Sequence, residues 1–186
     1  LKTGLIAEIG SGNPVIALRA DIDALTIREY TGLDYASYNG AMHACGHDFH
    51  QTSLLGAADI LKNREKELKG TVRLIFQPAE ENFQGGYQII EAGGLEGVSA
   101  IVGYHNYPHL KPGQLGLKTG AIMAGVEQFE VTVQGVSSHA ARPDLGVDTV
   151  LAVTSIVNNL QAIVARTVSP FESAVLSVTH IDVGTT

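Results

Sequence analysis

The stretch His43-Ala44-Cys45-Gly46-His47-Asp48 places several potential metal ligands next to one another and contains the only cysteine of the chain. Thiolate, imidazole and carboxylate groups are the side chains that bind zinc, manganese and related ions. If the stretch is extended, residues 43, 45 and 47 point to one side, because side chains alternate along a strand. Gly46 allows a tight turn between Cys45 and His47. The stretch therefore predicts a metal centre that the rest of the chain completes.

The segments around this stretch predict alternating strands and helices. Strands are predicted at residues 5–10, 15–18, 71–76 and 100–104. Helices are predicted over residues 48–61, where leucines recur at helical spacing, and over residues 86–92. This order is typical of an α/β fold with a mixed, mostly parallel sheet flanked by helices.

Residue types that bind metals follow directly on three of the predicted strands. Asp21 and Asp23 follow the second strand, Glu80 and Glu81 the third, and His105 the fourth. In open α/β sheets, ligands bind outside the carboxyl ends of the strands. We therefore expect these residues to meet the His/Cys stretch in one pocket.

The adjacent residues Glu80 and Glu81 suggest a division of labour. Neighbouring side chains at a strand end point in different directions, so that one carboxylate can bind an ion while the other faces a water. A metal ion lowers the pKa of such a water, and a free carboxylate can take its proton and pass it to a leaving nitrogen. The pair therefore favours a hydrolytic site.

The composition of the chain changes near residue 118, where a Gly-rich, nearly uncharged segment begins. We expect a partial catalytic metal-binding domain over residues 1–118 and a partial lid or dimerisation domain over residues 119–186. The second domain is predicted to be α+β, with strands at 129–133 and 174–178 and an amphipathic helix at 147–164. A unit this thin needs more chain or a second subunit to cover its open face.

Composition and charge narrow the possible partners. The chain of 186 residues is 45% hydrophobic and 17% charged, which favours a folded core over disorder. Its net charge of −7 argues against nucleic acid as a partner. No apolar run approaches the ~18–20 residues of a membrane span. A single cysteine suits a reducing compartment, so we expect a cytoplasmic protein without membrane contact.

Four segments carry a family resemblance: Arg19-Ala20-Asp21-Ile22-Asp23-Ala24-Leu25, Met42-His43-Ala44-Cys45-Gly46-His47-Asp48, Phe76-Gln77-Pro78-Ala79-Glu80-Glu81 and Ser138-His139-Ala140-Ala141. In this order they resemble the amidohydrolase branch of the aminoacylase/carboxypeptidase metallopeptidase superfamily. The branch includes N-acyl-amino-acid amidohydrolases, hippurate hydrolases and auxin-conjugate hydrolases. The resemblance implies a catalytic domain like that of metal-dependent exopeptidases and a smaller α+β lid domain. It also implies a homodimer that forms through the lid domain.

The resemblance also implies a site with two divalent metal ions. The positions that match its ligands are Cys45, His47, Glu81 and His105, with Cys45 bridging the ions. Glu80 matches the general base and Asp21 a supporting position that orients the site. His139 matches a lid histidine that reaches the active site of the partner subunit and helps to hold the substrate. The other histidines, among them His50, are expected to be structural or exposed.

The predicted function is metal-dependent hydrolysis of the amide bond in N-acyl amino acids or short peptides, with zinc, manganese, nickel or cobalt as the ion. The first alternative is a non-catalytic metal-binding or dimerisation protein. The second is a cysteine-nucleophile hydrolase that uses Cys45 with His47 or His43. The resemblance further implies another histidine ligand and an asparagine that the 186 residues do not contain, so we expect a part of a longer enzyme.

Overall fold

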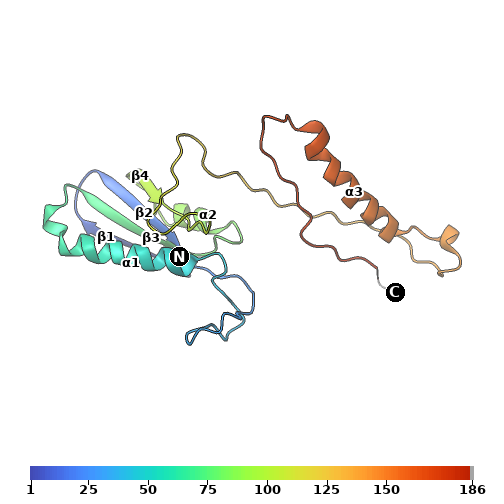
Figure 1. The fold of residues 1–186 in the computed structure, drawn as a ribbon, viewed down its shortest axis with the longest axis horizontal. Coiled ribbons are helices and arrows are strands. Elements are labelled where there is room, and N and C mark those ends of the chain that lie inside the picture. Colours follow the sequence, from blue (N-terminus) through green and yellow to red (C-terminus); the bar gives the residue numbers. More distant parts are fainter. Residues whose placement is uncertain (185–186) are drawn as a thin grey trace. The chain divides into compact units, whose positions relative to one another are not determined.

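The structure is a computed structural model that describes residues 1–184. The chain forms two compact units, one over Leu1–Leu117 and one that begins at Lys118. Figure 1 shows the elements of both, and each unit is described here by itself.

The first unit is built on a four-stranded sheet. Its strands are β1 (Leu5–Gly10), β2 (Val15–Asp21), β3 (Thr71–Gln77) and β4 (Val98–Gly103). Their order is β1-β3-β2-β4, in which β2 runs parallel to β3 and β4, whereas β1 pairs antiparallel with β3. The prediction of a mixed, mostly parallel sheet is confirmed.

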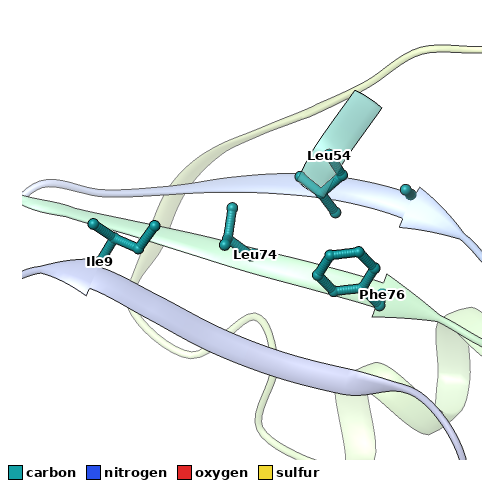
Figure 2. Packing of buried hydrophobic residues seen from close by; sticks show 5 residues of the cluster. Ile9, Leu54, Leu74 and Phe76 are labelled. Carbon is teal, nitrogen blue, oxygen red and sulfur yellow. The ribbon is translucent and has the colours of Figure 1, made fainter. Parts of the chain in front are cut away.

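The two central strands are buried on both faces, as their apolar sequences require. On one face, Leu74 and Phe76 of β3 pack with Ile9 of β1 and Leu54 from a helix (Figure 2). On the other face lies Ile75, which is 0% exposed. Successive side chains of β3 thus fill opposite cores, because side chains alternate along a strand.

Helices cover both faces of this sheet. α1 (His47–Asn63) packs over the Leu74 side through Leu54, and α2 (Gly85–Glu91) packs over the Ile75 side. α1 is followed by the short 3₁₀ helix η1 (Glu65–Glu67). Both helices lie where the apolar periodicity predicts them, and α1 begins directly at the His/Cys stretch.

The second unit contains the helix α3 (Thr149–Thr167), preceded by the 3₁₀ helix η2 (Pro143–Leu145). The side chain of Asp148 caps α3 by accepting a hydrogen bond from the backbone N–H of Leu151 at 3.0 Å. Such a cap satisfies one of the free amides of a helix start. The predicted helix over 147–164 is therefore present with slightly later bounds.

The strands predicted at 129–133 and 174–178 are wrong for the described part of this unit. Both segments have alternating apolar side chains, but neither forms a strand. Within residues 118–184, the backbone forms an isolated antiparallel bridge between Val136 and Val147. Alternation describes one face of a strand, but a strand also needs a neighbour that accepts and donates its backbone hydrogen bonds. Within residues 118–184 these two segments have no such neighbour.

α3 bears on the expectation that the protein has no membrane contact. Among the helices of residues 1–184, α3 is long and apolar enough to cross a membrane by length and composition alone. The sequence prediction relied on uninterrupted apolar runs. The mean hydropathy of α3 is high although polar residues such as Asn158 and Asn159 lie inside it. Helices that pack their apolar side on protein satisfy the same measure.

Candidate metal centre

The predicted ligands of the first unit meet at the carboxyl ends of its parallel strands. Three groups of side chains have potential ligand atoms within 4.8 Å of one another: Cys45 with His47 and His105, His47 with Glu80 and Glu81, and Asp21 with His47 and His50. His47 belongs to all three groups. The convergence expected from the strand ends therefore exists in the folded chain.

The His/Cys stretch is a turn followed by a helix start, and not an extended segment. The backbone N–H of Gly46 donates to the carbonyl of His43 at 3.0 Å, and α1 begins at His47. Gly46 has a φ of 87°, a left-handed conformation that glycine adopts without strain. Cys45 and His47 belong to the clusters of possible metal ligands, whereas His43, at the start of the turn, belongs to none of them.

His47 lies at the centre of the site and is 1% exposed. Its Nδ1 lies 3.0 Å from the backbone carbonyl of Asp23, to which it donates a hydrogen bond. The proton on Nδ1 leaves the lone pair of Nε2 free. This Nε2 atom is buried without a hydrogen-bond partner, 3.7 Å from Oε1 of Glu81 and 3.8 Å from Oε2 of Glu80.

Glu81 presents a second buried atom of the same kind. Its Oε1 has no hydrogen-bond partner, although buried polar groups are nearly always paired. Two buried acceptor atoms that face each other without a donor leave both underpaired, which costs free energy. A cation between them would give both a partner, so the residues fit a bound metal ion.

The turn after β3 fixes the two glutamates. Ala79, directly before Glu80, has a φ of 55°, and its carbonyl accepts hydrogen bonds from the N–H groups of Gln84 and Gly85. The Glu81 N–H donates to Oδ2 of Asp23 at 3.0 Å. The Glu80 side chain is 38% exposed and that of Glu81 is 25% exposed, so Glu80 is the carboxylate more open to solvent.

Cys45 and His105 form the other side of the site. The Cys45 Sγ lies 3.4 Å from Nε2 of His105, whose Nδ1 donates to the carbonyl of Asn106 at 2.8 Å. Burial, followed by the charge of Glu81, raises the pKa of the Cys45 thiol to about 11. A nucleophilic cysteine needs a lowered pKa, so this surrounding does not prepare Cys45 for attack on a substrate.

Asp21 is 1% exposed and uses both oxygens within the protein. Oδ2 pairs with Nη1 of Arg19 at 2.7 Å, and Oδ1 lies 2.6 Å from Nδ1 of His50. Burial raises the pKa of Asp21, but the hydrogen bond from His50 and the charge of Arg19 outweigh it and hold the pKa below 3.8. These contacts fit the supporting role that the sequence predicts.

Three residues of the site have contacts that the sequence did not predict: Asp23 was expected in the pocket without a specific role, His50 was expected to be structural or exposed, and Asn106 was not singled out. Each had a signal. Asp23 belongs to the same strand end as Asp21, His50 lies one helical turn after His47, and Asn106 follows His105. His50 was expected to be either structural or exposed, and at 1% exposure it is buried.

His139 lies in the second unit, apart in the chain from these clusters. Its side chain is exposed, and its Nδ1 accepts a hydrogen bond from the N–H of Ala141 at 3.1 Å.

A family model described as "Peptidase family M20/M25/M40" matches residues 17–180. Among curated relatives, the chain is 51% identical over 189 residues to an N-acetyl-L-cysteine deacetylase of Bacillus subtilis, covering 100% of this chain and 45% of the relative. It is 40% identical over 188 residues to an N-acyl-L-amino acid amidohydrolase of Geobacillus stearothermophilus, covering 99% and 51%. The chain thus spans about half the length of the curated relatives it matches.

Two solved structures are similar to this one. The Bacillus subtilis YXEP protein, a dinuclear metal-binding peptidase of family M20, has a TM-score of 0.57 and 62% identity over 59% of this chain and 32% of that one. A protein of methicillin-resistant Staphylococcus aureus, assigned as an aminohydrolase, has a TM-score of 0.72 and 35% identity over 96% of this chain and 49% of that one.

Proposed function

Because the chain belongs to peptidase family M20/M25/M40, we propose that it is part of a metal-dependent amidohydrolase that cleaves the amide bond of N-acyl amino acids or short peptides. The observation that carries this proposal is the buried, unpartnered pair of His47 Nε2 and Glu81 Oε1. Such a pair is costly in a folded protein unless something positively charged lies between its atoms.

Cys45, His47, Glu81 and His105 would hold two divalent ions. The donor set of one thiolate, two imidazoles and one carboxylate suits zinc, and also manganese, nickel and cobalt. The hydrogen bonds from Nδ1 support this assignment, because they place the ring proton of His47 and His105 on Nδ1 and leave the lone pair on Nε2, which in His105 faces the thiol of Cys45. The dinuclear description of the YXEP protein supports the number of ions.

When bound, the ions would lower the pKa of a water molecule and polarise the scissile carbonyl. Glu80 then acts as the general base, because its carboxylate is the more exposed of the two. It takes a proton from the attacking water and passes it to the amide nitrogen as the C–N bond breaks. The products are a carboxylate and a free amine.

The substrate class follows from the relatives, whose names specify N-acetyl-L-cysteine and N-acyl-L-amino acids. We propose that residues 1–118 form the catalytic domain and that residues 119–186 form the lid. His139 of the lid holds the substrate carbonyl or carboxylate in the partner subunit of a homodimer. The net charge of −7 and the single cysteine support a cytoplasmic enzyme that binds neither nucleic acid nor membrane.

The cysteine-nucleophile alternative requires surroundings that lower the pKa of the Cys45 thiol. The raised pKa of its thiol, about 11, keeps it protonated at neutral pH in the absence of an ion. The non-catalytic alternative shares the metal site and differs only in turnover. A single experiment separates all three.

The complete protein is treated with chelator, reloaded with zinc, manganese, cobalt or nickel, and assayed on a panel of N-acyl amino acids. The proposal expects about two ions per chain by elemental analysis, activity that is lost with the ions and recovered on reloading. Full activity in chelator would favour the cysteine nucleophile. Bound ions without hydrolysis of any substrate in the panel would favour the non-catalytic protein.

A further inference from the structure

His50 is a fully buried histidine that the proposed ligand set does not use. It lies on α1, one turn after His47, and its side chain is 1% exposed. Its ring packs edge-on against that of His105, with a distance of 4.7 Å between the ring centroids. A buried imidazole beside a proposed ligand needs a reason, because burying a polar ring is costly unless it is hydrogen-bonded.

Both nitrogens of His50 have partners from different segments of the chain. Nδ1 lies 2.6 Å from Oδ1 of Asp21, at the end of β2. Nε2 faces Asn106, with the backbone N–H at 2.9 Å and the side-chain oxygen at 2.6 Å. With the ring proton on Nδ1, which donates to Asp21, Nε2 accepts the backbone N–H of Asn106, whereas donation to the side-chain oxygen of Asn106 needs a second proton on Nε2.

These contacts make His50 a bridge and argue against its use as a ligand. Asp21, His47 and His50 are close enough to hold an ion. However, both nitrogens of His50 are engaged by Asp21 and Asn106, so an ion at His50 would have to displace one of these contacts. The role of His50 must therefore lie in what it connects.

The segment at the Asn106 end of the bridge carries the proposed ligand His105. Asn106 also packs over the turn that carries Cys45 and His47. A Cβ atom added to Gly46, between these two residues, would lie 2.5 Å from the side-chain oxygen of Asn106. The loop after β4 and the start of α1 therefore meet at Asn106, and His50 ties Asn106 to the end of β2.

We propose that His50 is a positioning residue that holds the loop bearing His105 against the turn bearing Cys45. The inference rests on the proposed metal site and adds a residue to it. Partners of this kind, which fix the orientation of a ligand without touching the ion, typically change metal affinity by about 10–100-fold when they are removed.

Two substitutions of His50 separate its contacts from its bulk. His50→Leu replaces the imidazole by an apolar side chain of similar length and removes the hydrogen bonds to Asp21 and Asn106. His50→Gln places an amide where Nε2 lies and can keep the link to Asn106. The matched control is Leu54→Ala, which removes a buried side chain four residues along the same helix and touches none of these contacts.

The complete protein and its variants are freed of metal and titrated with Co²⁺, whose absorption reports thiolate and imidazole ligation. Hydrogen exchange of the Asn106 amide is measured in the metal-free forms. We expect His50→Leu to lose about tenfold or more in Co²⁺ affinity, with an altered thiolate-to-cobalt band and an unprotected Asn106 amide. His50→Gln should retain the protection of the Asn106 amide and bind Co²⁺ with an affinity between those of wild type and His50→Leu. Leu54→Ala should melt at a lower temperature but bind Co²⁺ within about twofold of wild type.

An unchanged affinity and spectrum in His50→Leu would overturn the role of His50 while leaving the metal site intact. An equal loss of affinity in Leu54→Ala would do the same, because it would reduce the effect to general stability. Wild-type protein that binds no Co²⁺ would overturn the proposed function and this role together.

Discussion

Nε2 of His47 and Oε1 of Glu81 lie 3.7 Å apart in the buried centre of the first unit, and neither has a hydrogen-bond partner. The two residues come from the start of α1 and from the turn after β3, separated by more than thirty positions in the chain. The fold supplies each with a fixed neighbour, since Asp23 binds the far side of His47 and the backbone of Glu81. The chain has thus built the surroundings of an ion from its own side chains.

Glu80→Gln tests the general base. The variant keeps the shape of the side chain and removes its ability to accept a proton, so we expect kcat to fall about 10²–10⁴-fold while bound metal stays the same. Steady-state kinetics on an N-acyl amino acid and elemental analysis measure both. Glu91→Gln, an exposed change at the end of α2, serves as the control and should be silent. Near-full turnover of Glu80→Gln would remove the base assignment.

Cys45→Ala tests the thiolate ligand. The change removes the only sulfur of the site without adding bulk, and we expect metal content to fall from about two ions per chain to about one or fewer. Elemental analysis of dialysed protein gives the number directly. Cys45→Ser, which keeps a weaker donor at the same place, should be intermediate. Unchanged metal content in both variants would exclude Cys45 from the ligand set.

The pH dependence of thiol alkylation tests the electrostatics around Cys45. Because burial and then the charge of Glu81 raise the pKa of the thiol to about 11, the metal-free protein should react slowly with iodoacetamide at neutral pH. The rate should rise about tenfold per pH unit up to about pH 11, since only the thiolate reacts. Glu81→Gln removes one cause of the shift and should react faster at pH 8.

The raised pKa of the Cys45 thiol also makes the free energy of unfolding depend on pH. The folded thiol holds its proton more tightly than the unfolded one, whose pKa is about 9.0. Its contribution is therefore complete below pH 9 and is lost as the pH rises towards 11. Denaturant unfolding of metal-free protein across this window measures it, with Cys45→Ala as the reference. A loss of the same size in Cys45→Ala would assign the effect to other groups.

Two glycines of the His/Cys turn and α1 should respond to alanine in opposite directions. Gly46 has a φ of 87°, and an added Cβ would collide with Asn106, so Gly46→Ala should destabilise the fold by more than about 1 kcal/mol. Gly56 lies inside α1 with free space around it, so Gly56→Ala should stabilise the helix by up to about 1 kcal/mol. Urea unfolding compares the two. Equal effects would contradict the conformation assigned to Gly46.

Much of the first unit follows from its sequence, because local pattern and burial agree there. The apolar run before Asp21 has to be a buried strand, and the strand rule then places Asp21, Glu80 and His105 at one edge. The position of α1 follows from its leucine spacing. Sequence spacing alone could not show that His50 joins Asp21 to Asn106, since those contacts depend on how three segments pack.

The second unit shows the opposite case. Periodicity was sufficient for α3, because a helix satisfies its own backbone hydrogen bonds. It was insufficient for the segments near residues 129 and 174, because a strand takes its hydrogen bonds from another strand. An alternating pattern states which face would be buried and leaves open what would pair with it.

Asp23 contacts the site through two chemically independent groups. Its main-chain oxygen receives the Nδ1 proton of His47, and its side chain receives the amide of Glu81. A substitution of Asp23 removes its side-chain contacts, which include Oδ1 at 3.3 Å from Nδ1 of His47, but every amino acid brings the same carbonyl. Replacing Asp23 would therefore loosen the glutamate turn and remove a negative charge beside the imidazole, while the carbonyl still accepts the Nδ1 proton and fixes the tautomer of His47.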